Sequence, residues 1–100
     1  MPIYILMTTL TPGSIGNAED RRGQGKSWLK KVHKECPEVK WLSHYALLGR
    51  YDFMDIYEAP DDARAHKVSL ISRQAGAATA ESWPAMSYEQ HLELLEDVTD

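Results

Sequence analysis

The chain has little of several features that mark common protein classes. It contains one cysteine, Cys36, among 100 residues, which excludes an intrachain disulfide framework and is typical of a reducing compartment. No apolar run approaches the roughly 18 residues that a membrane-spanning helix needs, and the N-terminus lacks the basic and then apolar segments of a signal peptide. We therefore expect a cytoplasmic protein with no membrane partner.

The chain also has fewer basic than acidic residues. Eleven lysines and arginines stand against 15 aspartates and glutamates, which gives a formal net charge of −4 at pH 7. Generic nucleic-acid binding needs a basic surface, so this balance argues against a nucleic acid as partner. Repeats and linker-like stretches are absent too, and 43% of the residues are hydrophobic, so residues 1–100 are expected to form one domain with one core.

Four segments of the chain are predicted to form β-strands. Each is a run of β-branched, aliphatic or aromatic residues bounded by turn-forming residues. They are residues 3–10, 39–48, 51–57 and 77–83, the last ended by Pro84. The pair Gly49-Arg50 separates the second from the third, which predicts a β-hairpin and a glycine with positive φ in its turn.

Three helices are predicted from apolar spacing and from end signals. The first begins within residues 14–25 and ends before Pro37, because the residue that precedes a proline avoids helical angles. The second begins at residues 60–62, where two aspartates suit a helix N-terminus. The third begins with Ser87 and Gln90, which are spaced as a capping box.

The resulting order βαββαβ, followed by a helix, is that of the ferredoxin-like α+β fold. In this fold a four-stranded antiparallel sheet carries two helices on one face and leaves the other face open. An open face with sizeable apolar residues has to be covered, most often by a second copy of the chain. We therefore expect a homo-oligomer that associates through the open face.

The hairpin carries the pair of residues with the most chemical interest. A two-residue turn at Gly49-Arg50 places His44 opposite Asp55, with Cβ atoms roughly 5 Å apart, so the imidazole and the carboxylate can hydrogen-bond. In an apolar cavity the two could act as general acid and base, with Asp55 orienting His44. The alternative is structural, because a buried carboxylate needs a partner and His44 supplies one.

The same pairing divides the hairpin into two faces. The face of His44 and Asp55 is expected to be the open one, because the other face is more uniformly bulky and apolar and is therefore assigned to the helices. The set assigned to the helices is Trp41, Tyr45, Leu47, Met54 and Ile56. The candidate ligand-binding residues are Tyr51, Phe53 and Tyr57 on the open face and Arg50 at the hairpin tip.

The hairpin also resembles a known family. Residues 45–52, Tyr-Ala-Leu-Leu-Gly-Arg-Tyr-Asp, are similar to the signature of the GYD-domain family, which is named for a glycine, a tyrosine and an aspartate in this hairpin. Those three are Gly49, Tyr51 and Asp52 here. Asp52 is expected to bond backbone amides and hold the hairpin, whereas Tyr51 suits a structural and a ligand-binding role about equally.

The resemblance covers nearly the whole chain. Weaker matches are Pro2-Ile3-Tyr4, residues 58–62 and Ser87-Tyr88-Glu89. The resemblance implies a ferredoxin-like domain related to the dimeric α/β barrels, and it implies no particular activity. Asp55 in mid-strand and His91 in the last helix depart from the family pattern.

No complete metal site or nucleotide loop is found in the sequence. His33 and Cys36 stand three residues apart on one helix, but two ligands without a second pair make a weak metal signal, and Cys36 is expected to pack as a small hydrophobe. Residues 23–27 resemble a phosphate-binding loop only superficially, because the first glycine and the preceding strand are missing. We predict no metal and no cofactor.

Three functions fit these observations. The preferred one is a homo-oligomeric module that binds an unknown small molecule in a cavity at the open sheet face. The second is a cofactor-independent enzyme of the dimeric α/β-barrel kind, such as a monooxygenase, isomerase or decarboxylase, that uses His44 and Asp55. The third is an accessory subunit that docks on another protein. The residues alone do not decide whether the chain is an enzyme.

Overall fold

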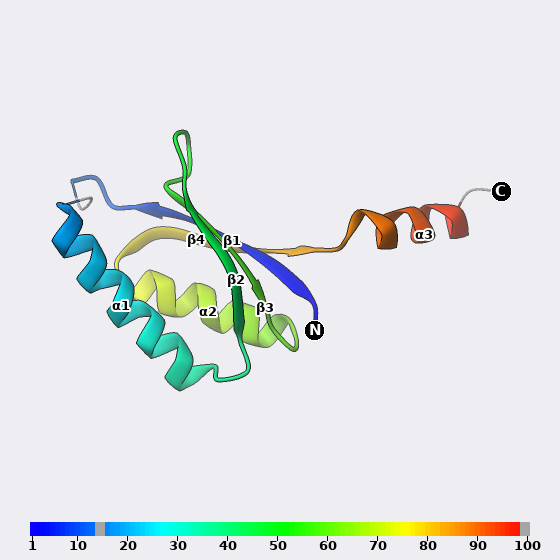
Figure 1. Cartoon of the computed structure of the whole chain (residues 1–100), viewed down its shortest axis with the longest axis horizontal. Helices are drawn as coiled ribbons and strands as arrows, with labels where there is room; N and C mark the ends of the chain where they lie inside the picture. Colours follow the sequence, from blue (N-terminus) through cyan, green and yellow to red (C-terminus); the bar gives the residue numbers. More distant parts are fainter. Residues whose placement is uncertain (14–15, 99–100) are drawn as a thin grey trace.

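The computed structural model describes residues 1–13 and 16–98, and its elements follow the order βαββαβα (Figure 1). The strands are β1 (Ile3–Leu10), β2 (Lys40–Ala46), β3 (Phe53–Glu58) and β4 (Ala77–Ala85), and the helices are α1 (Ala18–Glu35), α2 (Asp62–Gln74) and α3 (Tyr88–Val98). The sheet is antiparallel, in the order β2-β3-β1-β4, with α1 and α2 on one face. This is the predicted ferredoxin-like α+β fold.

The helix ends follow the capping residues in the sequence. Asn17, Asp61 and Ser87 each accept a hydrogen bond from the amide three residues later, over 2.9, 2.9 and 3.2 Å. These caps satisfy amides that have no partner within the helix. α1 begins at Ala18, within the predicted window, of which residues 14 and 15 lie outside the described part of the chain.

One strand end and one turn differ from the prediction. β4 continues through Pro84 to Ala85, because β4 is an edge strand and a proline there costs no ladder hydrogen bond. The hairpin loop spans residues 47–52, so the chain reverses over more residues than the predicted two. Gly49 therefore does not need a positive φ and does not have one, which makes that prediction wrong.

The core lies between the sheet and the two helices that cover it. Its largest fully buried side chains are Tyr57, Leu6, Val32, Val68 and Cys36. Cys36 packs at the C-terminal cap of α1 as a small hydrophobe, and burial raises the pKa of its thiol. Trp28 and Trp41 extend the core at one side, with ring centroids 4.9 Å apart.

Most of the hairpin faces the opposite way from the predicted assignment, although Trp41 lies toward the helices and Tyr51 on the uncovered side, as predicted. Phe53, Asp55 and Tyr57 of β3 point toward α1 and α2, and so does His44 of β2, so the prediction that they form the open face is wrong. Tyr57 lies in the centre of the core, where its ring stacks on Tyr4 with centroids 5.6 Å apart.

A bulge in β2 explains why strict alternation fails. Trp41 pairs with Tyr57, but Ser43 pairs with the residue just before Tyr57, so Leu42 is an extra residue in the strand. The bulge puts Trp41 on the same face as His44, although they are three positions apart. The large indole therefore lies toward the helices, as predicted, and shares that side with His44, which the alternation placed on the other face.

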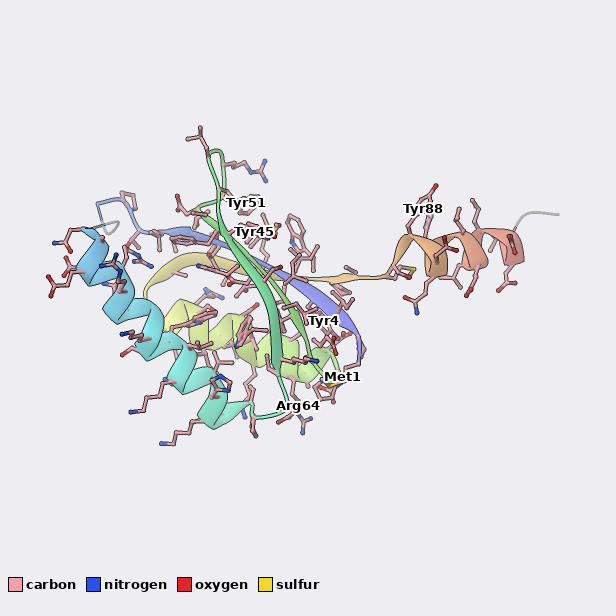
Figure 2. The ribbon with its side chains drawn as sticks, viewed as in Figure 1. Met1, Tyr4, Tyr45, Tyr51, Arg64 and Tyr88 are labelled. Carbon is pink, nitrogen blue, oxygen red and sulfur yellow. The ribbon has the colours of Figure 1, made fainter. Side chains whose placement is uncertain are left out.

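The face that α1 and α2 do not cover is rich in apolar and aromatic side chains. Tyr45 and Tyr51 lie on the side of the sheet away from α1 and α2 (Figure 2). The ring of Tyr51 meets Trp83 edge to face, with centroids 5.8 Å apart. Alternation along β3 places Met54 and Ile56 on the same side. No helix of residues 1–13 and 16–98 covers this face.

α3 projects away from the rest of the molecule (Figure 1). It contacts no other helix or strand of the described chain, and none of its residues is buried. The radius of gyration is 15.3 Å, against about 13 Å for a compact chain of this length. Among the described helices, none combines the length and the apolar character needed to cross a membrane.

Candidate functional site

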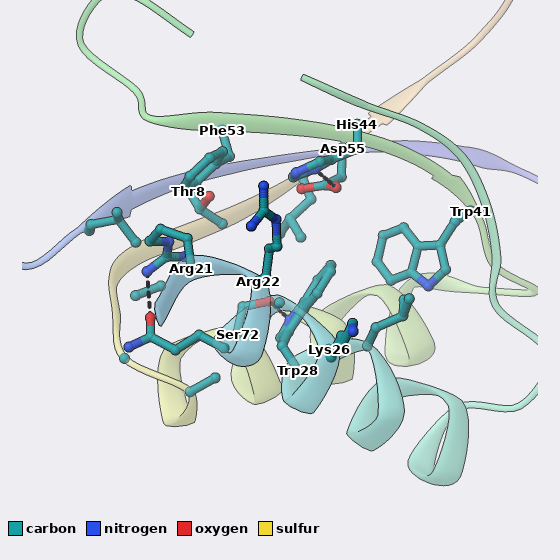
Figure 3. Close-up of a pocket in the computed structure, with 18 of the residues that line it drawn as sticks. Thr8, Arg21, Arg22, Lys26, Trp28, Trp41, His44, Phe53, Asp55 and Ser72 are labelled. Atoms are coloured by element: carbon teal, nitrogen blue, oxygen red, sulfur yellow. Dashed lines mark hydrogen bonds and ion pairs between the residues drawn. The ribbon is translucent and has the colours of Figure 1, made fainter. Parts of the chain in front are cut away.

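A cavity lies between the N-terminal half of α1 and the sheet (Figure 3). Its volume is about 770 Å³. The C-terminal half of α1 packs against the sheet through Trp28, Val32 and the cap residue Cys36. On the same face of the helix, the N-terminal half carries Arg21 and Gly25 instead. These two residues leave the space between this half of α1 and the sheet unfilled.

Aromatic side chains form two walls of this cavity. Trp28 of α1 and Trp41 of β2 meet at one side, and the Trp28 Nε1–H donates to Ser72 Oγ over 2.8 Å. Phe53 of β3 lines the other side and stacks on His44, with centroids 5.6 Å apart and an interplanar angle of 19°. The walls are therefore flat and rigid, as suits a planar ligand.

His44 and Asp55 are opposite each other across β2 and β3, as the hairpin register predicts. His44 Nδ1 donates a hydrogen bond to Asp55 Oδ1, which fixes the imidazole tautomer and leaves Nε2 without a proton when the ring is neutral. The Asp55 side chain is 6% exposed and the His44 side chain 62% exposed. Burial raises the pKa of Asp55, and the contact with His44 opposes that rise.

Asp55→Asn is expected to change the pH dependence of stability. The folded pKa of Asp55 lies above its ordinary value of 3.8, so the unfolded chain ionises first as the pH rises. Wild type therefore loses stability between that value and the folded pKa, whereas asparagine never ionises and still accepts from His44. Urea unfolding should show that the free energy of unfolding of the variant, relative to that of wild type, rises between pH 3 and pH 7. Glu93→Gln on α3 is the control, and an equal gain there contradicts the prediction.

Three cations of α1 line the cavity: Arg21, Arg22 and Lys26. The Arg21 guanidinium lies over the Phe53 ring, 5.5 Å from its centroid, and donates to Gln24. None of the three forms an ion pair with a carboxylate of residues 1–13 or 16–98. The sequence did not single out Arg21 or Arg22, although Arg21, Gly25 and Trp28 recur at helical spacing on one face of α1.

The hairpin motif lies beside the cavity and does not line it. Asp52 Oδ2 accepts from the Leu10 amide over 2.7 Å, and the Asp52 amide donates to the Thr8 carbonyl over 2.8 Å, so Asp52 ties the hairpin to β1. Arg50 Nη2 donates to the Tyr51 hydroxyl over 3.3 Å at the exposed tip. The structure therefore separates Arg50 and Tyr51 from His44.

Tyr57 is buried in the core, so a cavity ligand cannot reach it either. Its side chain is 0% exposed, and its hydroxyl lies 2.7 Å from Ser82 Oγ. Burial raises the pKa of Tyr57 to about 12. Of the four candidates, Phe53 alone lines the cavity, from the face that the helices cover.

Comparison with known proteins identifies the family. The model of the GYD domain matches residues 4–95. The chain belongs to the GYD-domain family. A relative of this GYD-domain chain is the glutamine synthetase and cystathionine beta-lyase binding protein of Thermus thermophilus. The two are 29% identical over an alignment of 80 residues, which covers 77% of this chain and 80% of that protein.

A solved structure supports the fold of the GYD domain. The crystal structure of FFRP-DM1 superposes with a TM-score of 0.51 and 17% sequence identity. The match covers 86% of this chain and 100% of the other. A structural match at this level of sequence identity supports the arrangement of strands and helices and gives no information about activity.

Proposed function

We propose that this GYD-domain chain is a homo-oligomeric module that binds a small molecule in the cavity between α1 and the sheet. The observation that carries this function is the cavity itself. Its volume of about 770 Å³ lies within the roughly 300–1,000 Å³ typical of ligand sites. Aromatic walls with a few polar groups suit ligand binding better than the exposed hairpin tip does.

Self-association is supported by the sheet face that α1 and α2 leave uncovered. Tyr45 is 53% exposed and Trp83 40% exposed there, beside Met54 and Ile56 of β3. Large aromatic residues on one exposed surface are typical of interfaces. A second copy that covers this face leaves the cavity on the opposite face accessible.

An accessory subunit that docks on another protein is the second candidate. The Thermus thermophilus relative is named as a binding protein of two enzymes. The helix α3, which packs on no other helix or strand of residues 1–13 and 16–98, also has the form of a docking helix. Its apolar stripe is Tyr88, Leu92, Leu95 and Val98, and its acidic residues are Glu89, Glu93, Glu96 and Asp97.

An enzyme remains a third candidate because of the pair in the cavity wall. His44 has a free Nε2 while Asp55 holds its tautomer, which is the arrangement of an oriented general base. If the pair acts on a bound molecule, wild type should consume that molecule, whereas His44→Gln should bind it and leave it unchanged.

Native mass spectrometry of the full chain, purified from its own host, separates these functions. We expect an oligomer that retains a small molecule. Gly25→Leu should lose that molecule, because no atom lies within 4 Å of where a Cβ on Gly25 would stand and the new side chain enters the cavity. Gly23→Leu is the matched control on the same helix, outside the lining. A retained protein in place of a small molecule favours the accessory subunit, and a bare monomer contradicts the proposal.

A further inference from the structure

The charge around the cavity indicates which class of small molecule it takes. Resting on the proposed function, we propose that the ligand is an aromatic carboxylate, with its ring against the aromatic walls and its carboxylate among the cations of α1. The cations are Arg21, Arg22 and Lys26, and the aromatic residues are Trp28, Trp41 and Phe53.

The cations are placed to receive an anion rather than to pair within the chain. Arg21 and Arg22 reach from α1 toward the strands that form the opposite wall (Figure 3). Phe53 holds the Arg21 guanidinium over its ring, which fixes the orientation of that group. A guanidinium presents a planar fork of N–H donors that matches a carboxylate, so two of them with Lys26 form a strong anion-binding edge.

Among the described residues, none of these three cations has an ion-pair partner in the cavity. Asp55 is the carboxylate of the described lining, and it accepts the hydrogen bond from His44. Other lysines of α1, among them Lys30 and Lys34, do not line the cavity. The excess positive charge therefore faces a partly enclosed space, where it acts more strongly on an anion than it would on an open surface.

The aromatic walls select the rest of the ligand. The Trp28–Trp41 pair and Phe53 stand on either side of the space that the N-terminal half of α1 leaves unfilled. Stacking and edge contacts with these rings favour a flat apolar body over a flexible or strongly polar one. Because the cations come from α1, the anionic group should lie toward that helix.

Two isosteric probes test the charge preference directly. Naphthalene-2-carboxylate and naphthalene-2-carboxamide differ in one ionised group, and calorimetric or NMR titration of the full chain gives both affinities. We expect the carboxylate to bind about tenfold or more tighter, since hydrogen bonds to a charged group exceed neutral ones by about that factor. Arg22→Gln with Lys26→Gln leaves Arg21 as the one cation among the described lining residues and should reduce this preference. Lys30→Gln with Lys34→Gln makes the same change in net charge outside the cavity and should preserve it.

The outcomes separate this inference from the proposed function. If wild type binds both probes equally and Gly25→Leu binds neither, the preference for a carboxylate is wrong. The cavity then still stands as a small-molecule site. An equal loss of preference in both double variants shows an unspecific charge effect and also overturns the aromatic carboxylate. Binding of both probes that Gly25→Leu leaves unchanged places them elsewhere and overturns both proposals. If neither probe binds, the aromatic carboxylate is wrong, and native mass spectrometry decides whether the cavity holds another class.

Discussion

Replacing Tyr57 with alanine is expected to lower the free energy of unfolding by about 4 kcal/mol, as removal of a large buried aromatic side chain leaves a cavity that the core refills only in part. The ring is fully buried, it stacks on Tyr4, and it lies 5.1 Å from Trp41 between centroids. The variant also loses the hydroxyl contact with Ser82. Urea denaturation followed by circular dichroism measures the change.

Tyr45→Ala is the matched control for the two faces of the sheet. Tyr45 is on β2, on the face that α1 and α2 do not cover, so its removal from an isolated subunit should cost under about 1 kcal/mol. At higher protein concentration the cost should grow if a second copy covers Tyr45. Equal costs for the two tyrosines at low concentration contradict the assignment of the faces.

Trp83→Glu is expected to weaken self-association by about a hundredfold or more, because it replaces an aromatic anchor with a charge that the interface would bury unpaired. Trp83 lies on the open face in edge-to-face contact with Tyr51, and its Nε1–H donates to Glu81 over 2.9 Å. Size-exclusion chromatography with light scattering over a dilution series gives the dissociation constant.

Leu70→Glu introduces the same charge at an exposed apolar residue of α2, on the other side of the sheet. The two variants have equal net charge, so they differ in the side of the sheet on which the new glutamate lies. We expect Leu70→Glu to associate as wild type does. A wild type that is monomeric at every concentration is the result that rejects association through the open face.

Local signals in the sequence predicted the fold well. The capping residues Asp61 and Ser87 act on their own helix ends, over three residues, so the sequence suffices to locate them. The pairing of His44 with Asp55 also followed from the hairpin alone, since the register near the turn depends on a short stretch of chain.

The faces of the sheet and the lining of the cavity needed the structure. The bulge at Leu42 puts Trp41 on the same side as His44, and nothing in the local sequence marks it. Both faces of the hairpin are rich in aromatic residues, so bulk alone did not show which one the helices cover. Arg21 and Arg22 become candidate site residues only through the cavity between the N-terminal half of α1 and the sheet.

The bond from Asp52 to the Leu10 amide has a consequence for the family as a whole. It secures the hairpin to the end of β1, just before the chain leaves the sheet for α1, while Gly49 and Tyr51 remain outside the cavity. The signature thus belongs to the frame of the domain, whereas the residues of the proposed ligand site lie on α1 and on the inner face of the sheet. A shared signature therefore predicts shared architecture, and under the proposed function the ligand preference depends on the lining of each cavity instead.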